Sequence, residues 1–250
     1  MSLRAVYVVW LRELIKFWRE KARIVTSLVQ PAVWLFVMGK GLSGFVHLHG
    51  PFSGSYTAFM LPGVMGMTVL FASIFSSVSI IWDRDFGFLK EMLVAPVPRS
   101  ALVFGKILSG ATVAMIQGTL VLIFSPFVGV QLSFTGVLEA MGTMFLLSLS
   151  LSGLGIAVAT RMTSMQGFQL VMNFLLMPMY FLSGAIYPLQ GLPTWMSAIA
   201  RIDPLAYGVD ALKWALIRFH QFSLSVDYAV LVGLAVVFTL IATSLFKMEG

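Results

Sequence analysis

The chain contains no cysteine and few charged residues. Without cysteine it has neither disulfide bonds nor thiolate metal ligands. Charged residues make up only 10% of the 250 residues and hydrophobic residues 59%, whereas an average soluble domain is about one quarter charged. Together with a mean hydropathy of +0.94, this composition predicts a polytopic membrane protein.

The sequence also lacks a nucleotide-binding loop. No segment matches G-x-x-x-x-G-K-[ST], the pattern whose backbone amides and lysine hold nucleotide phosphates. A membrane span takes about 20 residues, so a chain of this length holds about six spans and no sizeable soluble domain. We therefore expect no ATP site, no cofactor, no metal and no catalytic residue in this chain. Any function that needs a sizeable soluble domain is expected to belong to another polypeptide.

Six apolar runs are long enough to cross a bilayer, which predicts an all-α fold. They cover residues 25–46, 56–82, 101–128, 136–160, 167–186 and 228–246. Six crossings put both termini on one side, and of the 16 lysines and arginines all but Lys40, Arg201, Lys213 and Arg218 then lie there. By the positive-inside rule this is the cytoplasmic side of the membrane. The net charge of +6 therefore indicates topology and anionic lipid contact rather than nucleic-acid binding.

Residues 1–24 have the pattern of an amphipathic helix. Apolar side chains recur at Leu3, Val6, Trp10, Leu14 and Phe17, with basic residues around them. This spacing predicts a helix that lies at the surface of the cytoplasmic leaflet, either as a plain anchor or with a dedicated role.

Residues 83–99 form the longest charged interruption between spans. Asp83 and Asp85 stand where a helix N-terminus favours anions, and Pro96 and Pro98 prevent continuation. The pattern predicts a short capped helix on the cytoplasmic side, although a solvated loop with a helical turn fits the spacing as well.

The connection 187–225 is apolar but carries several charges. Each charge at the bilayer centre would cost about 2.5 to 3.5 kcal/mol, so we expect two short helices that dip into the outer leaflet without crossing. The second has an apolar stripe from Leu205 to Phe219, with Asp210, Lys213 and Arg218 off the stripe.

Polar residues inside the spans are candidates for a translocation pathway, because their burial in lipid is costly. The candidates are Gln30, Gln117, Gln169 and Asn173, with Trp34 and Tyr180 as aromatic neighbours. The alternative is hydrogen bonding between helices, worth about 0.6 kcal/mol on average.

Gly41-Leu-Ser-Gly44 is followed by His47 and His49, which superficially suggests an intramembrane hydrolase with Ser43 as nucleophile. That chemistry needs a histidine from another span, and neither histidine lies on one. The two histidines with His220 form only a weak metal signal, and surface histidines are the simpler interpretation.

Several short motifs occur in a fixed order along the chain. They are QP at 30–31, FMLPG at 59–63, DRDFG at 83–87, LVAP at 93–96, GK at 105–106, FLSGAIYP at 181–188, LPTW at 192–195 and DPLAY at 203–207 followed by Asp210. In this order they resemble the ABC type-2 transporter permeases, the membrane subunits of ATP-driven exporters. The family's usual asparagine is Asp203 here, and the usual arginine after Asp210 is Lys213.

The resemblance implies a single transmembrane domain over residues 1–250 that works with two ATP-binding subunits and a second permease copy, identical or homologous. ATP and Mg²⁺ would be bound by the partner subunits. The loop helix would be the ATPase-coupling helix, with Asp85, Phe86, Phe88, Leu89, Lys90, Glu91 and Leu93. The outer-leaflet helices would form an external gate with Pro188, Pro193, Trp195, Pro204 and Tyr207.

The motifs look most like the branch that exports drugs and amphiphiles, so the expected substrate is a hydrophobic or amphipathic compound. Export of a polysaccharide or lipid-linked glycan is the alternative within the family. A passive channel and the hydrolase are the alternatives outside it.

Overall fold

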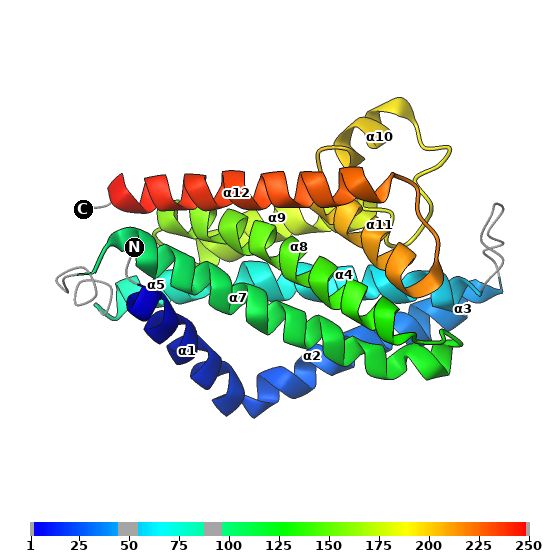
Figure 1. The fold of residues 1–250 in the computed structure, drawn as a ribbon, viewed down its shortest axis with the longest axis horizontal. Coiled ribbons are helices and arrows are strands. Elements are labelled where there is room, and N and C mark those ends of the chain that lie inside the picture. Colours follow the sequence, from blue (N-terminus) through cyan, green and yellow to red (C-terminus); the bar gives the residue numbers. More distant parts are fainter. Residues whose placement is uncertain (1–2, 45–54, 88–96, 249–250) are drawn as a thin grey trace.

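The structure, a computed structural model, describes residues 3–44, 55–87 and 97–248, and every regular element in these ranges is a helix (Figure 1). Six helical segments are long and apolar enough to span a membrane: Ile24–Ser43, Tyr56–Asp85, Arg99–Val128, Phe134–Arg161, Met165–Leu182 and Leu224–Phe246. The predicted all-α membrane fold with six spans is confirmed.

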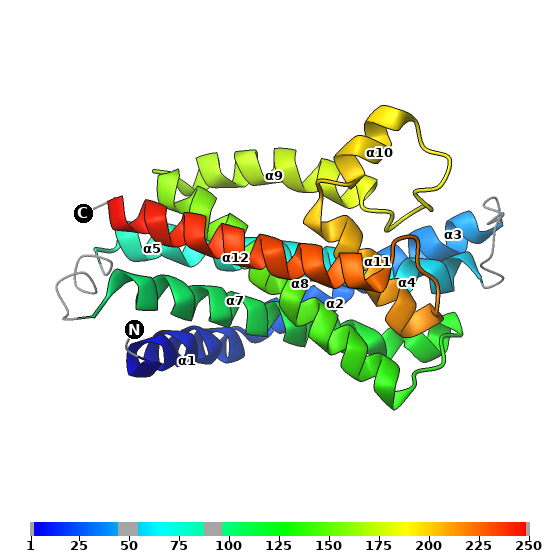
Figure 2. The same cartoon turned by 45° about the horizontal axis from the view of Figure 1, so that its top comes forward.

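Both ends of the described chain lie at the same end of the bundle, on the left in Figures 1 and 2. We call this the termini end and the opposite one the far end. This arrangement agrees with an even number of crossings. Which end faces the cytoplasm stays a prediction.

The first helix, α1 (Leu3–Arg19), runs obliquely along α7 (Arg99–Val121). A Cβ on Gly105 would lie 2.8 Å from Val9 Cβ, so the two helices approach closely there. Trp10 Nε1 donates a hydrogen bond to Thr112 Oγ1 at 3.0 Å. The helix therefore packs on the side of the bundle, and its position relative to a membrane surface stays a prediction.

The first span is irregular. It consists of α2 (Lys21–Val33), a π-helical stretch (Trp34–Gly39) and α3 (Lys40–Ser43). Pro31 lies inside α2 and lacks a backbone N–H, so the regular hydrogen-bond ladder cannot run through it. The π-helical stretch follows directly, as is common where a helical ladder is interrupted.

The second span, α4 (Tyr56–Ser76) with α5 (Val78–Asp85), is the centre of the bundle. It packs against α7, against α8 (Phe134–Arg161) and against α11 (Pro204–Ile217). The helices α2 and α9 (Met165–Leu182) flank its remaining face, and α9 runs along the outer edge of the bundle in Figure 2. The last span, α12 (Leu224–Met248), packs mainly on α8.

Asp83 and Asp85 do not begin a new helix, as the sequence suggested, but form the last turn of α5. The helix continues this far because the Asp83 carboxylate is neutralised by Lys106 and Arg12 from neighbouring helices. Gly87, with φ +75°, then ends it in the left-handed region that glycine adopts without strain.

Two short helices, α10 (Thr194–Ala200) and α11, lie between the last two spans at the far end, as predicted. The apolar stripe is not the only packed face of α11, because Asp210 and Lys213, which lie off it, are also buried. The Asp210 carboxylate accepts hydrogen bonds from the backbone amides of Gln221 and Phe222, so its burial is compensated.

Candidate functional site

The first part of the site is a buried ionic network at the termini end. Lys106 of α7 is only 4% exposed, and its ammonium lies 2.6 Å from Asp83 Oδ2, 2.9 Å from Ser79 Oγ and 3.7 Å from Glu13 Oε1. The network therefore joins α7 to α5 and α1. A buried charge is tolerated only when it is paired in this way.

Arg12 ties α1 more firmly to the same network. Its Nη2 atom donates to Asp83 Oδ2 at 2.9 Å and also to Glu13. Burial alone raises the pKa of Glu13, but the charges of Lys106 and Arg12 outweigh it and hold the pKa below its ordinary value. The Glu13 carboxylate is thus ionised at neutral pH.

The next residue of α5 holds the opposite side. Arg84 donates to the backbone oxygens of Met162 at 2.8 Å and Thr160 at 2.9 Å, where α8 ends. Trp82 Nε1 donates to Met165 Sδ at 3.1 Å, at the start of α9. We call Arg12, Glu13, Asp83, Arg84 and Lys106 the coupling junction. It fixes the end of α5 to α1, α7, α8 and, through Trp82, α9.

The predicted ATPase-coupling residues follow this junction directly. Asp85 and Phe86 are exposed, and Phe86 is 84% exposed. Phe88, Leu89, Lys90, Glu91 and Leu93 lie outside the described residues. The coupling assignment stays a prediction, but its first residues extend from an anchored helix end.

The second part of the site is a stripe of partly exposed side chains on the second span. Most of α4 is buried, whereas Thr68, Phe71 and Phe75 are not, and Ser79 and Trp82 continue the same row on α5. They are three or four residues apart, so they lie on one helical face. This α4 stripe lies on the face that α2 and α9 flank.

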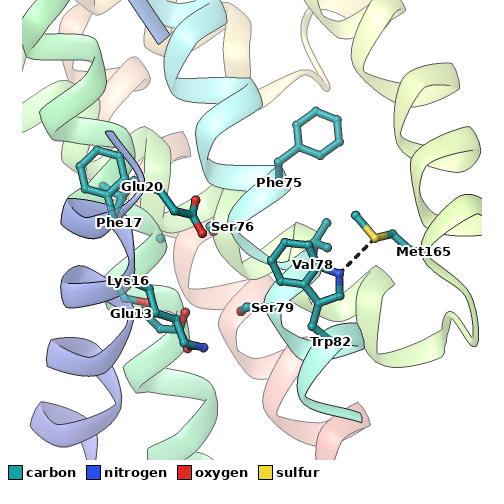
Figure 3. Close-up of a pocket in the computed structure, with 13 residues that line it drawn as sticks. Glu13, Lys16, Phe17, Glu20, Phe75, Ser76, Val78, Ser79, Trp82 and Met165 are labelled. Atoms are coloured by element: carbon teal, nitrogen blue, oxygen red, sulfur yellow. Dashed lines mark hydrogen bonds and ion pairs between the residues drawn. The ribbon is translucent and has the colours of Figure 1, made fainter. Parts of the chain in front are cut away.

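Two cavities lie along the stripe. We call the cavity near the termini end the lower cavity and the one nearer the far end the upper cavity. The lower cavity has a volume of about 280 Å³ and is shown in Figure 3. It is lined by Glu13, Lys16, Phe17, Glu20, Phe75, Ser76, Val78, Ser79, Trp82, Ser109, Gly110, Val113 and Met165. The upper cavity has a volume of about 70 Å³ and is lined by Ser27, Gln30, Pro31, Val64, Met67, Thr68, Phe71, Ala72 and Gln117. The stacked rings of Phe71 and Phe75, 6.0 Å apart, each belong to one of the two cavities.

The structure brings some of the predicted pathway residues together. Gln30 and Gln117 line the upper cavity from α2 and α7. The rings of Trp34 and Tyr180 are in contact, with centroids 5.7 Å apart. Gln169 and Asn173 are exposed on α9 and line neither cavity. Their pathway role stays a prediction that rests on sequence alone.

A tight contact joins the far end of α4 to the turn after α9. A Cβ on Gly63 of α4 would lie 2.3 Å from the backbone oxygen of Ala185, so the turn after α9 rests directly on α4. Lys213, 2% exposed, donates to Gly184 O at 2.6 Å, and its ammonium lies 3.6 Å from the Phe59 ring centroid. Tyr56 Oη donates to Ile186 O at 3.1 Å. We call this contact the far-end seal.

The predicted gate residues divide into two groups. Pro204 and Tyr207 are buried in α11, and Tyr207 Oη donates to Arg201 O at 2.7 Å. Pro188 is half-buried, whereas Pro193 and Trp195 are exposed at α10. The gate assignment stays a prediction, and of its five residues Pro204 and Tyr207 are the buried ones.

Asp203 caps the N-terminus of α11. Its Oδ1 accepts a hydrogen bond from Leu205 N at 2.8 Å, while Oδ2 is buried without a hydrogen-bond partner among the described residues. Burial raises the pKa of Asp203 to about 8 and the Leu205 bond only partly opposes this. The carboxyl is therefore mostly protonated at neutral pH and caps the helix as a neutral group.

The described residues contain no cluster of three histidine, cysteine or acidic side chains that is able to hold a metal. The Ser43 hydroxyl donates to Lys40 O at 2.7 Å, within its own helix. His220 is exposed, and His47 and His49 lie outside the described residues.

The sequence interpretation missed the coupling junction. It placed the charged residues of segment 1–24 on the polar side of an amphipathic helix and gave Lys106 no partner. One signal was available, since Lys106 is a lysine within an otherwise apolar predicted span and needs a buried carboxylate. Asp83 was the nearest candidate along the chain.

Comparison with known proteins gives a consistent result. Residues 4–217 match the pattern of the family described as ABC-2 type transporter. The chain is similar to the putative transport permease ycf38 of Cyanophora paradoxa, with 25% identity over 98% of this chain and 88% of the relative. It is similar to nodulation protein J of Rhizobium leguminosarum bv. viciae, with 28% identity over 96% and 92%. It is also similar to the inner membrane transport permease YadH of Escherichia coli K12, with 26% identity over 97% and 94%.

Proposed function

The chain belongs to the ABC-2 type transporter family, and from this premise we propose that it is the membrane permease subunit of an ATP-driven exporter of hydrophobic or amphipathic compounds. It works with two ATP-binding subunits, which hold ATP and Mg²⁺, and with a second permease copy. The termini end faces the cytoplasm of a bacterial or archaeal cell. The chain needs no ATP site of its own, because the partner subunits bind and hydrolyse ATP.

The coupling junction is the observation that carries this proposal. A helix end that leads into an exposed loop is held by charge pairs to α1 and α7 and by backbone hydrogen bonds to the end of α8. A force on the loop is therefore transmitted to the walls of the lower cavity, since α1, α5, α7 and α9 all line it. Nucleotide-driven movement of a partner then shifts the permease between two arrangements.

The α4 stripe supports the second permease copy. It carries the two cavities on one face of the bundle, and its side chains stay partly exposed in the part of the chain that the structure describes. A single unit of this kind has a groove, and two facing units enclose a conduit. The walls combine polar groups with aromatic and aliphatic side chains, which suits a substrate with both a polar and a large apolar part.

Export of a polysaccharide or lipid-linked glycan is the second candidate. Aromatic rings follow one another along the α4 stripe at Trp82, Phe75 and Phe71, and the rings of Phe71 and Phe75 are stacked. Stacked aromatic side chains are also what a sugar conduit needs. Stimulation of ATP hydrolysis by an oligosaccharide rather than by an amphiphile distinguishes the two candidates.

The test is co-purification with candidate ATP-binding subunits followed by ATP hydrolysis in lipid nanodiscs. Phe86→Ala removes an exposed ring next to the junction, and Phe134→Ala removes one that is 85% exposed at the far end. We expect Phe86→Ala to reduce complex formation and hydrolysis, and Phe134→Ala to leave both unchanged. If no ATP-binding subunit associates, or if the two variants behave alike, the proposal fails.

A further inference from the structure

The upper cavity is lined by a buried carboxamide that has no partner in the described part of the chain. Gln117 of α7 is only 4% exposed and lines this cavity, yet no hydrogen bond joins its side chain to another described residue. It belongs to the span Arg99–Val128. Buried polar groups almost always have a hydrogen-bond partner, and within the hydrocarbon layer lipid supplies none. The carboxamide therefore needs a partner that enters the cavity.

The other polar groups of the upper cavity are uncharged as well. Gln30 lines it from α2, and the hydroxyls of Ser27 and Thr68 line it from α2 and α4. Both hydroxyls donate to backbone oxygens of their own helices, at 2.7 and 2.9 Å, so that their oxygens remain as acceptors. The carboxamides of Gln30 and Gln117 supply both donors and acceptors. None of the described residues that line the cavity carries a charge.

We propose that the upper cavity is a binding site for one uncharged polar group of the substrate, a hydroxyl or a carboxamide, which Gln117 and Gln30 hold. Such groups donate and accept hydrogen bonds at once, as the two side chains do. This inference rests on the proposed function, because it specifies the polar part of the amphipathic compound that the permease moves.

The size and the polarity of the cavity restrict the group that binds. A volume of about 70 Å³ takes a group of a few heavy atoms, whereas a pocket for a whole small molecule has about 300 Å³ or more. A charged group would lose its hydration without gaining an opposite charge from the described lining, which is costly. The site therefore favours hydroxyl or carboxamide groups over ammonium and carboxylate groups.

The apolar part of the substrate is placed along the α4 stripe. Val64, Met67 and Phe71 line the upper cavity beside the carboxamides. The Phe71 ring stacks on Phe75, which lines the lower cavity. A chain or ring whose polar group binds Gln117 therefore extends over these two aromatic rings towards the termini end.

Photolabelling of the purified chain in lipid nanodiscs, without any ATP-binding subunit, measures this binding. The probe is decanol with a diazirine in its chain close to the hydroxyl, and mass spectrometry identifies the labelled residues. We expect saturable labelling of Met67 and Phe71. Unlabelled decanol and decanamide protect these residues. Decyl methyl ether, which has no donor, and decyltrimethylammonium, which is charged, protect at least about fivefold less at equal membrane concentration. Equal protection by the alcohol and the ether overturns the proposal, because the cavity would then recognise the chain alone.

Variants test the two carboxamides. Gln117→Met keeps the length of the side chain and is expected to fold, because the carboxamide that it removes bonds no described residue. It weakens protection by decanol about fivefold, the scale of one hydrogen bond, and leaves protection by the ether unchanged. Gln30→Met, at an exposed position of α2, has the same effect in the same direction. Gln131→Met, at an exposed glutamine in the connection before α8, is the matched control and behaves as the wild type.

Two outcomes of the variants overturn the proposal. One is wild-type protection by decanol in both Gln117→Met and Gln30→Met. The other is an equal loss for the alcohol and the ether, which would show that the two side chains only support the packing of the cavity.

The two proposals fail separately in this design. Saturable labelling that depends on the hydroxyl, without any association of ATP-binding subunits, contradicts the proposed function and retains the site. Coupled ATP hydrolysis without such labelling retains the permease and removes the site.

Discussion

At the scale of single residues, the buried ion pair of Asp83 and Lys106 is where we expect a substitution to cost the most stability. Removing one partner of a buried ion pair typically costs about 3 to 5 kcal/mol, because the other charge is left without compensation. We expect Lys106→Met to lower the free energy of unfolding by about 3 kcal/mol, measured by SDS titration in mixed micelles. The Asp83→Asn/Lys106→Met double variant should lose less than the sum of the two single losses.

Lys16→Met is the matched control for this prediction. Lys16 also pairs with Glu13, at 3.4 Å, but its side chain is 50% exposed. A loss of about 1 kcal/mol or less is expected there. If both lysine variants lose the same amount, the buried network contributes nothing beyond a surface ion pair.

Asp203 predicts a specific dependence on pH. The unfolded carboxyl titrates near 3.8, whereas burial raises the pKa of Asp203 to about 8 in the folded protein. Between these pH values the folded state binds more protons, so the free energy of unfolding falls as the pH rises, by up to about 1.4 kcal/mol per pH unit, and levels off above the folded pKa. Asp203→Asn keeps the cap and carries no such slope.

Thermal unfolding of the wild type and of Asp203→Asn at a series of pH values measures this difference. Other titrating groups contribute equally to both proteins, so the difference between the two curves isolates Asp203. Asp203→Ala is the control that removes the cap and is less stable at every pH. Parallel curves for the wild type and Asp203→Asn would show that Asp203 is ionised in the folded state.

At the scale of helices, the far-end seal depends on close approach of α4 to the turn after α9. In Gly63→Ala the new Cβ meets backbone atoms of Ala185, which, unlike a side chain, cannot move away by changing rotamer. We expect a loss of about 1 to 3 kcal/mol and faster proteolysis of the 186–193 connection. In Gly142→Ala, on α8, the new Cβ meets nothing within 4 Å, so the higher helix propensity of alanine should be neutral or stabilising. Equal effects of the two variants would contradict a tight contact at Gly63.

The helices themselves were predictable from the sequence, whereas the contacts between them were not. A span is a local property of a long apolar run, so all six were found within a few residues of their observed bounds. The Arg12–Asp83 contact joins residues 71 positions apart and depends on how α1 packs on α7. The burial of Lys213 likewise depends on the Gly184 carbonyl and the Phe59 ring, which other elements supply. Side chains that find such partners do not follow the hydropathy pattern of their own helix.

At the scale of the whole molecule, the position of the α4 stripe predicts how the two proposed permease copies meet. The α4 stripe lies between α2 and α9, so a conduit closes only if the second copy faces this side. The chain has no cysteine, so one introduced cysteine reports on a single position. Phe174→Cys places it at an exposed position on α9, and Leu240→Cys places it on α12, in a groove lined by α1, α7 and α8. We expect a short bis-maleimide to link Phe174→Cys into dimers in native membranes and to leave Leu240→Cys monomeric. Linking of Leu240→Cys alone would show that the copies pair through α12. The α4 stripe of each copy would then face lipid rather than the other copy.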